Sequence, residues 1–372
     1  MNTGMVYFAD LRTSVKRNLF DKIDELLNCI GMGKMFKKGQ LVAVKLHFGE
    51  KGNTSFINPI FAARVVDGIS STGALPFLTD TSTLYIGTRA NAVSHLKTAV
   101  ENGFGYSTVK APVIIADGLR GDDGEHVEVN GRHLKEVKIA RAISEAHGLV
   151  ALTHFKCHEM TGIGGALKNI GMGCAAREGK LTQHSKCAPL VDPGSCTACG
   201  VCALNCPADA IDVGAVAVIN DGSCIGCGYC IAVCPEAAIK IQWNESTINL
   251  QEKMAEHAYG ALKGKKGKCA FLSFVMHVSP ECDCYGHSDA AIVPDVGILA
   301  STDPVAIDQA AADLVNARQG IPGTALGPDK DALKPGSDKF KRLHPDVDWT
   351  VQLRHAEELG LGSRRYELKE VF

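Results

Sequence analysis

The chain has 372 residues, of which 45% are hydrophobic and 22% are charged, and its formal net charge is −2. This near-neutral balance argues against nucleic acid or an anionic membrane surface as the main partner. No apolar run approaches the ~18 residues that a membrane helix needs, and the first residues lack the layout of a secretory signal. We therefore expect a cytoplasmic globular protein with two domains, or with one large domain that carries an insertion.

Short apolar runs alternate with helical patterns in the first half of the chain. The runs are MVYFAD, LVAVKLHF, ALPFLTD, VIIAD and GLVALTHF, which begin at positions 5, 41, 74, 113 and 148. Such β-branched runs, bounded by Gly, Asn and Asp, predict strands that are buried on both faces of a mostly parallel sheet. Asn130 and Gly131, which stand between two extended runs, predict a β-hairpin. The fold class that we expect is α/β, with helices flanking the sheet.

Fourteen of the 15 cysteines lie between positions 157 and 284, and eight of them form a repeat. CTACGVCALNCPADAIDV (196–213) is followed 28 residues later by CIGCGYCIAVCPEAAIKI (224–241). The spacing C-x-x-C-x-x-C-x-x-x-C-P is that of a bacterial two-cluster ferredoxin, in which the fourth cysteine ligates the other cluster. Two [4Fe–4S] clusters are predicted. The ligands are Cys196, Cys199, Cys202 and Cys234 for one cluster, and Cys224, Cys227, Cys230 and Cys206 for the other.

The alternation of strands and helices resumes after the cysteine repeat. KCAFLSFVM (268–276) and AAIVPDVGILA (290–300) read as strands, and Thr302-Asp303-Pro304 opens a helix. These strands are too few to form a sheet of their own. We therefore expect residues 1–186 and 246–372 to form one α/β domain, interrupted by a small α+β two-cluster module at 187–245.

Polar residues follow several of the predicted strands at the point where each strand ends. In open α/β sheets, ligands bind outside the carboxyl ends of the strands, which predicts a pocket there. Lysines in such a pocket would bind a small anionic substrate, and histidines would transfer protons. A simpler interpretation is that polar residues are merely tolerated at strand ends. The candidate residues are Lys45, His47, His154, Lys156, His158, Lys168 and Asp295.

A glycine-rich stretch, GIGGALKNIGMG (162–173), follows one of these strands. The amides near Gly164 and Gly165 could face an anion or a cofactor, although the stretch matches neither a P-loop nor a dinucleotide-binding pattern. The sequence contains no flavin or nicotinamide fingerprint. A flavin that binds without such a motif stays an open alternative. Six of the seven cysteines outside the repeat could hold a further metal or cluster, but packing or reactive thiols are favoured. They are Cys157, Cys174, Cys187, Cys269, Cys282 and Cys284.

Several strings together resemble one known family over nearly the whole chain. They are HFKCHEMTGIGGALKNIGMG (154–173), CDCYGHSDAAIVPDVGILASTDPVAID (282–308), VKLHFGEKG (44–52) and the cysteine repeat. The chain resembles the iron–sulfur centre proteins of domain-of-unknown-function family 362. The resemblance implies an α/β domain with an internal or adjoining ferredoxin module, of a kind found in anaerobic prokaryotes. It implies no catalytic residue.

We expect an iron–sulfur redox protein that passes low-potential electrons through two clusters to the strand-end pocket. An oxidoreductase is one kind of protein that fits this expectation. One alternative is a non-catalytic electron-transfer subunit that docks on a larger reductase, with the basic run LKGKKGK (262–268) in the interface. Another is a factor that handles a metal or cluster for another enzyme. A redox partner protein is expected in the first two cases.

Overall fold

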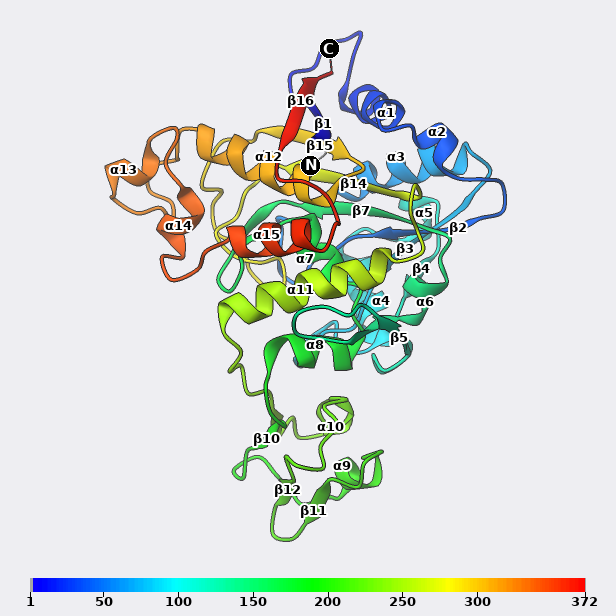
Figure 1. Ribbon diagram of the computed structural model, residues 1–372, viewed down its shortest axis with the longest axis vertical. Coiled ribbons are helices and arrows are strands. Elements are labelled where there is room, and N and C mark those ends of the chain that lie inside the picture. Colours follow the sequence, from blue (N-terminus) through cyan, green and yellow to red (C-terminus); the bar gives the residue numbers. More distant parts are fainter. Residues whose placement is uncertain (1–2, 372) are drawn as a thin grey trace.

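The computed structural model describes residues 3–371, which form a large lobe and a smaller one (Figure 1). The large lobe is built around an eight-stranded sheet with the order β16-β1-β15-β14-β7-β2-β3-β4. Its strands are β1 (Gly4–Ala9), β2 (Leu41–Lys45), β3 (Leu75–Asp80), β4 (Val113–Ile115), β7 (Gly148–His154), β14 (Cys269–Val275), β15 (Gly297–Ser301) and β16 (Tyr366–Glu370).

The sheet is mostly parallel, which confirms the predicted α/β class. Strands β14, β7, β2, β3 and β4 run in one direction. Strand β15 is antiparallel to both of its neighbours, β1 and β14, while β16 pairs with β1 in parallel. Because β14 and β15 lie between β1 and β7, the segments before and after the cysteine repeat contribute strands to the same sheet.

Helices cover both faces of this sheet (Figure 1). In β2, Val42 and Val44 belong to one apolar core, whereas Ala43 between them belongs to the other. This alternation follows from the two-residue period of a strand, and both faces are apolar because both are covered. The first core packs against α1 (Leu19–Cys29) and α3 (Pro59–Ser70), and the second against α7 (Ala166–Gly171), α11 (Thr247–Leu262), α12 (Pro304–Ala317) and α15 (Thr350–Glu358).

Local sequence signals set several element boundaries. Asp303 caps α12 by accepting hydrogen bonds from the amides of Val305 and Ala306, as predicted from the Asp-Pro start. Asn130 adopts a left-handed conformation (φ 49°) between β5 (Gly124–Glu128) and β6 (Glu136–Ala140), which form the expected hairpin. The strand expected at 290–300 forms only from Gly297 onward, because Pro294 has no amide hydrogen for a ladder.

The remaining elements of the large lobe are short, apart from α4 and α8. They are α2 (Met32–Met35), α4 (Ala92–Glu101), α5 (Tyr106–Val109), α6 (Arg141–Glu145), β8 (Lys156–His158), β9 (Gly162–Gly164), α8 (Arg177–His184), α13 (Lys330–Leu333) and α14 (Lys339–Leu343). Among residues 3–371, no helix combines the length and the hydrophobicity that crossing a lipid bilayer requires.

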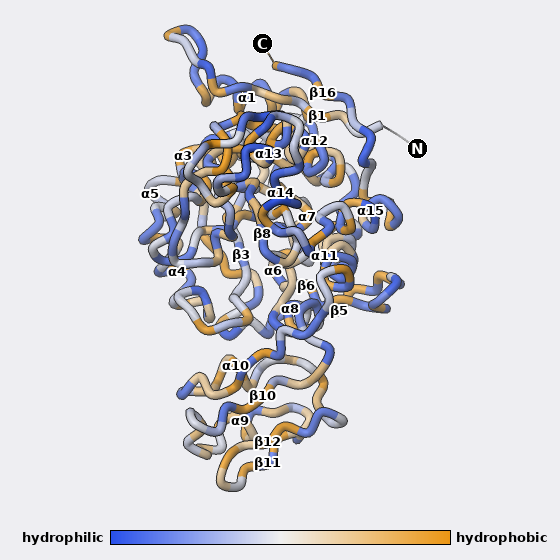
Figure 2. The backbone as a smooth tube through the Cα atoms, turned by 90° about the vertical axis from the view of Figure 1, so that its left-hand side faces the viewer, coloured by the Kyte–Doolittle hydropathy of each residue, from blue (hydrophilic) through white to orange (hydrophobic). Residues whose placement is uncertain are grey.

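The smaller lobe contains the cysteine repeat and lies next to α8 in both views (Figures 1 and 2). Its backbone repeats as its sequence does: Gly200 and Gly228, which are 28 positions apart, both adopt the left-handed conformation, with φ 77° and 69°. Its ends meet where β10 pairs with β13. Its elements are β10 (Leu190–Val191), α9 (Val201–Leu204), β11 (Ile211–Val213), β12 (Ala217–Ile219), α10 (Tyr229–Val233) and β13 (Ile239–Lys240).

Candidate functional site

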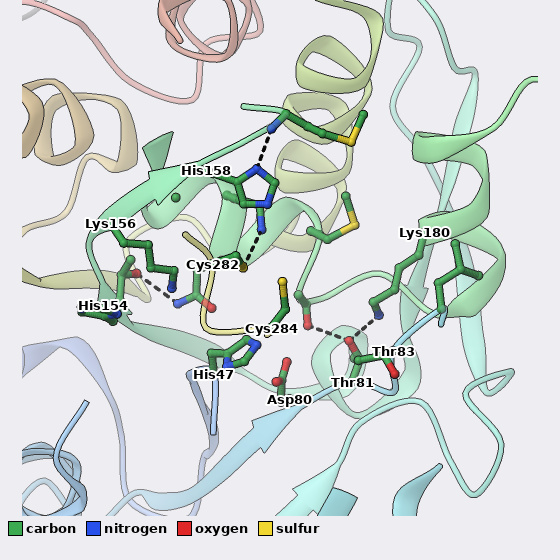
Figure 3. A pocket seen from close by; sticks show the side chains of 18 of the residues that line it. His47, Asp80, Thr81, Thr83, His154, Lys156, His158, Lys180, Cys282 and Cys284 are labelled. Atoms are coloured by element: carbon green, nitrogen blue, oxygen red, sulfur yellow. Dashed lines mark hydrogen bonds between the residues drawn. The ribbon is translucent and has the colours of Figure 1, made fainter. Parts of the chain in front are cut away.

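A cavity of about 610 Å³ opens beside the carboxyl ends of β2, β3 and β7 (Figure 3). The sheet brings these ends to one edge, as the parallel topology requires. Most of the candidate residues from the sequence line this cavity, in the same wall as Asp80 and Arg89. The candidates in the wall are Lys45, His47, His154, Lys156, His158, Lys168, Gly164 and Gly165.

Asp295 lies elsewhere, which corrects its assignment to the pocket. Its side chain is exposed, and Oδ1 accepts a hydrogen bond from the backbone amide of His277 at 2.5 Å. His277 has a left-handed backbone (φ 48°), so Asp295 stabilises the turn that follows β14. Its carboxylate therefore binds a backbone amide at the surface and is not part of the cavity wall.

Asp283 is a buried anchor beneath the cavity wall. One carboxylate oxygen lies 2.9 Å from Nδ1 of His154, and the other accepts from Nζ of Lys156 at 2.7 Å. Ser55 Oγ donates a third hydrogen bond at 3.1 Å. Burial alone would raise the pKa of Asp283, but the charges of His154 and Lys156 hold this pKa well below its ordinary value. Asp283 is therefore ionised, and its hydrogen bonds hold His154, Lys156 and the loop around residue 283 in place.

A second buried network surrounds Asp80. Lys45 Nζ lies 2.9 Å from Asp80 Oδ1 and donates to Asn169 Oδ1 at 2.8 Å. Arg89 Nε lies 3.1 Å from Glu50 Oε2, and its Nη1 lies 3.8 Å from Asp80 Oδ2. Burial would raise the pKa of Asp80, but Lys45 and the other neighbouring cations hold it well below its ordinary range. The charges of Lys45 and Arg89 are thus offset by the protein's own carboxylates.

Two histidines present defined tautomers to the cavity. Nδ1 of His47 accepts from the amide of Gly49 at 2.9 Å, and Nδ1 of His158 accepts from the amide of Met160 at 3.1 Å. Burial, followed by the charge of Arg89, lowers the pKa of His47 well below its ordinary value. His47 is therefore a neutral ring with its hydrogen on Nε2, which can donate to a ligand oxygen.

Helix α8 adds residues that the strand-end argument missed. Lys180 Nζ donates to Thr81 Oγ1 at 2.5 Å, and burial lowers the pKa of Lys180 to about 8. His184, one turn further on, packs edge-on against Trp243 with ring centroids 4.7 Å apart. Both pairs line the cavity. No strand-end pattern could have found them, because α8 reaches the cavity only through tertiary packing.

Cys282 and Cys284 also line the cavity, on either side of Asp283 (Figure 3). Lys168 Nζ lies 3.7 Å from Sγ of Cys282. A hydrogen bond from the Cys284 side chain, followed by the nearby Lys168 and His158, lowers the pKa of Cys282 well below its ordinary value despite burial. The same hydrogen bond and burial raise the pKa of Cys284. Of the two, Cys282 is therefore the thiol that ionises more readily.

The glycine-rich stretch does not offer its amides to an outside anion. The amides of Ala166 and Leu167, at the start of α7, donate to the carboxylate of Asp308 at 2.6 and 2.9 Å. A Cβ on Gly165 would lie 2.4 Å from Cγ of Asp308, so glycine is required for this close approach. Gly164 and Gly165 still line the cavity. The expected anion cradle is thus filled by the protein's own side chain.

The eight repeat cysteines lie around two small cavities of about 20 Å³ each in the smaller lobe. Each set takes three cysteines from one copy of the repeat and the fourth from the other copy. The sets are Cys196, Cys199, Cys202 and Cys234 around one cavity, and Cys206, Cys224, Cys227 and Cys230 around the other.

Backbone amides point at sulfur in both sets. In the first set, Ala217 N lies 3.5 Å from Sγ of Cys196, and in the second, Ala210 N lies 3.3 Å from Sγ of Cys206. Amide donors of this kind stabilise thiolates and tune the potential of a cluster. Within residues 3–371, no three His, Cys, Asp or Glu side chains converge closely enough for a single metal ion. Four cysteines spread around a cavity fit the larger [4Fe–4S] group.

Four further cysteines outside the repeat lie away from the cavity. Cys157 and Cys174 are fully buried in the apolar core, and burial raises the pKa of each thiol. Cys269 Sγ lies 3.4 Å from the carbonyl oxygen of Lys265. Near the lobe boundary, Asn244 Nδ2 lies 3.0 Å from Sγ of Cys187. None of these four lines the large cavity.

The sheet, its covering helices and the strand-end cavity define an α/β protein with a cysteine-rich insertion in its chain. Residues 42–313 match the family model described as "Domain of unknown function (DUF362)". The chain belongs to this family. A search of curated protein sequences gave no significant relative.

Solved structures give a more distant likeness. The lactate racemase apoprotein from Thermoanaerobacterium thermosaccharolyticum is 12% identical, with a TM-score of 0.37, over 73% of this chain and 51% of that one. A protein from Thermotoga maritima is 11% identical, with a TM-score of 0.35, over 68% of this chain and 50% of that one. The chain thus spans about half the length of these proteins. Likeness at this level carries no conclusion about activity.

Proposed function

We propose that this protein is an iron–sulfur redox protein whose smaller lobe holds two [4Fe–4S] clusters and whose large cavity binds a small anionic substrate. The observation that carries the proposal is the grouping of the eight repeat cysteines into two sets of four, each drawn from both copies of the repeat. Clusters bound in this way supply one-electron transfer at low potential.

Packing between the lobes supports a connection between the cysteine sets and the cavity. Leu84 lines the large cavity and belongs to the same apolar cluster as Cys230 and Leu181. A Cβ on Gly228, beside Cys227, would lie only 3.3 Å from Cγ of Arg177 in α8. Trp243, at the end of the smaller lobe, lines the cavity itself. The second cysteine set is therefore the one nearer the cavity.

The charges in the cavity favour an anionic ligand. Within the described part of the chain, Lys168 and Lys180 have no carboxylate partner within ion-pair distance, unlike Lys45, Lys156 and Arg89. Lys180 is buried in the wall, where an uncompensated charge is costly, and Lys168 is half-buried, with Sγ of Cys282 3.7 Å from its Nζ. A carboxylate or phosphate group between them would offset that cost. Lys180, with a pKa of about 8, can also donate a proton near neutral pH.

The surface of the smaller lobe supports docking of a redox partner protein. Leu204 is 87% exposed, Ile225 is 61% exposed and Val218 is 60% exposed. Apolar side chains of this size on a small lobe are typical of a surface that meets another protein. We place the electron donor there, on the side of the cysteine sets, and the substrate in the cavity.

The test is reoxidation of the dithionite-reduced protein, followed anaerobically by visible absorbance, with small reducible carboxylates (2-oxo acids and 2,3-unsaturated acids) as the electron acceptors. We expect a subset of these acids to accelerate reoxidation by taking up the electrons of the clusters. Lys168→Met and Lys180→Met should abolish the acceleration while iron content is unchanged. The matched control is Lys253→Met, since Lys253 pairs with Glu245 outside the cavity. Intact clusters with no response to any anion would instead favour a non-catalytic electron-transfer subunit.

A further inference from the structure

Cys282 and Cys284 are the two cysteines outside the repeat that line the large cavity, and the proposed function leaves them unused. We propose that they form a redox-active dithiol that exchanges with small disulfides and closes into an intramolecular disulfide. The proposal does not depend on the clusters. It rests on the proposed anionic-substrate cavity only for the expected preference between probes.

The backbone holds the two cysteines in a tight turn. Tyr285 N donates to the carbonyl oxygen of Cys282 at 3.2 Å, which bends the chain across 282–285. Both cysteines line the large cavity, at the first and third positions of this turn. Closing a disulfide requires nearby Cα atoms and converging side chains, and a turn meets both requirements.

Neighbouring elements fix this turn from both sides. The Asp283 side chain, between the two cysteines, is held by His154, Lys156 and Ser55 as described above. The carbonyl oxygen of Cys284 accepts from the Tyr85 hydroxyl at 3.1 Å, and that of Asp283 accepts from the amide of Glu50. A turn anchored in this way keeps the sulfur atoms facing the cavity through a redox cycle.

Charged neighbours favour the thiolate on Cys282. Lys168 Nζ is 3.7 Å from Sγ, and the His158 ring lies in the same cavity wall. The opposing groups are Glu159 and the Tyr285 hydroxyl, which lie on the side of Cys284. A buried thiol pair with no cation would stay protonated, as Cys157 does in the core. The arrangement is that of an attacking thiolate with a resolving thiol beside it.

The exchange balances as follows. The Cys282 thiolate attacks one sulfur atom of an external disulfide, which forms a mixed disulfide and releases the other half as a thiolate. Cys284 then loses its proton and attacks Sγ of Cys282, which releases the second half as a thiol after it takes up that proton. The protein has lost two electrons and gained one S–S bond, and the external disulfide has gained both electrons. The reverse reaction with an external dithiol restores the starting state.

The experiment uses full-length protein that has been reduced and desalted anaerobically. It is exposed to 3,3′-dithiodipropionate, a dianionic disulfide, or to 2-hydroxyethyl disulfide, a neutral one of similar size. Alkylation and fragmentation mass spectrometry then locate the bonds. We expect a Cys282–Cys284 disulfide with both probes, and a mixed disulfide trapped at Cys282 in Cys284→Ser. Lys168→Met should slow the exchange by roughly threefold for each unit by which the thiol pKa rises.

Cys269→Ser is the matched control, because Cys269 is the other cysteine of the tryptic peptide that follows Lys268 and is packed away from the cavity. This variant should form the disulfide at the wild-type rate. Thiols at 282 and 284 that stay alkylatable after both probes would overturn the proposal, as would thiols protected from alkylation until a chelator is added. Equal rates for the two probes would contradict the preference of the cavity for anions but not the dithiol. A lack of iron would contradict the clusters but not the dithiol.

Discussion

Leu84 lies in the wall of the large cavity and packs in the same apolar cluster as Cys230 of the smaller lobe. One side chain thus belongs both to the wall of the cavity and to the apolar cluster that contains Cys230. Arg177 strengthens this junction, because its guanidinium donates to the carbonyl oxygens of Thr83, Arg120 and Ala90 while its stem meets Gly228. The smaller lobe therefore packs against the loop of residues 83–90, which contributes to the cavity wall.

The contact between the smaller lobe and Arg177 of α8 can be tested with two glycines that share a left-handed conformation. Gly200→Ala and Gly228→Ala each place a side chain at a left-handed position, which costs about 1–2 kcal/mol. The new Cβ at 200 would meet nothing within 4 Å, whereas that at 228 would lie 3.3 Å from Arg177. In anaerobic thermal unfolding we expect Gly228→Ala to be the less stable variant, with faster proteolysis between the lobes. Equal effects of the two changes would show that the junction does not constrain Gly228.

The role of Asp283 as an anchor predicts a large loss of stability. Asp283→Asn leaves the buried cations His154 and Lys156 without their carboxylate, and breaking a buried pair in this way costs about 3–5 kcal/mol. Ser55→Ala removes one hydrogen bond from an uncharged donor to the same carboxylate and should cost less, about 1.5–3 kcal/mol. Denaturant unfolding measures both variants. A loss in Asp283→Asn no greater than that in Ser55→Ala would contradict the anchor.

The close approach of Gly165 to Asp308 predicts strong overpacking. Gly165→Ala places a Cβ 2.4 Å from the carboxylate carbon that accepts from the amides at the start of α7, and we expect a loss of about 1–3 kcal/mol or more. Gly33→Ala is the control, since the added Cβ meets nothing within 4 Å. In denaturant unfolding, that variant should match or exceed the wild type. A tolerated Gly165→Ala would mean that Asp308 can move aside.

Lys180 gives stability a specific dependence on pH. Burial lowers its pKa from 10.5 to about 8, so between these values the unfolded chain binds more protons than the native protein. Stability should therefore rise as pH rises from about 8 to 10.5, by about 3 kcal/mol if the whole shift is expressed. Because other groups titrate in this window, the quantity to measure is the difference between the wild type and Lys180→Met in unfolding free energy. A difference that stays constant with pH would contradict the lowered pKa.

Residue pattern alone predicts much of the sheet and part of the cavity wall. The apolar runs identify β2, β3 and β7, and the parallel topology brings Lys45, His154 and Lys156 to one edge. Arg89 and Lys180 could not be predicted, because they lie on a loop and on a helix that only tertiary packing brings to that edge.

The same limit explains the two corrections. Asp308 lies more than 140 residues along the chain from the amides that it accepts from, so the filled cradle at Gly165 leaves no local signal. Asp295 stands two residues before β15, and its carboxylate lies at the surface, where it accepts from the amide of His277. Local patterns report which residues are polar near a strand end, and they do not report which partner each side chain meets.

The central claim is that the two cysteine sets of the smaller lobe each hold a [4Fe–4S] cluster. The most direct measurement is iron and acid-labile sulfide per chain after anaerobic purification, with electron paramagnetic resonance of the reduced protein. The account predicts about eight of each in the wild type and in Cys187→Ser, and about four in Cys196→Ser or Cys224→Ser. Wild-type iron content in the double variant Cys196→Ser/Cys224→Ser, or zinc in place of iron in the wild type, would contradict it.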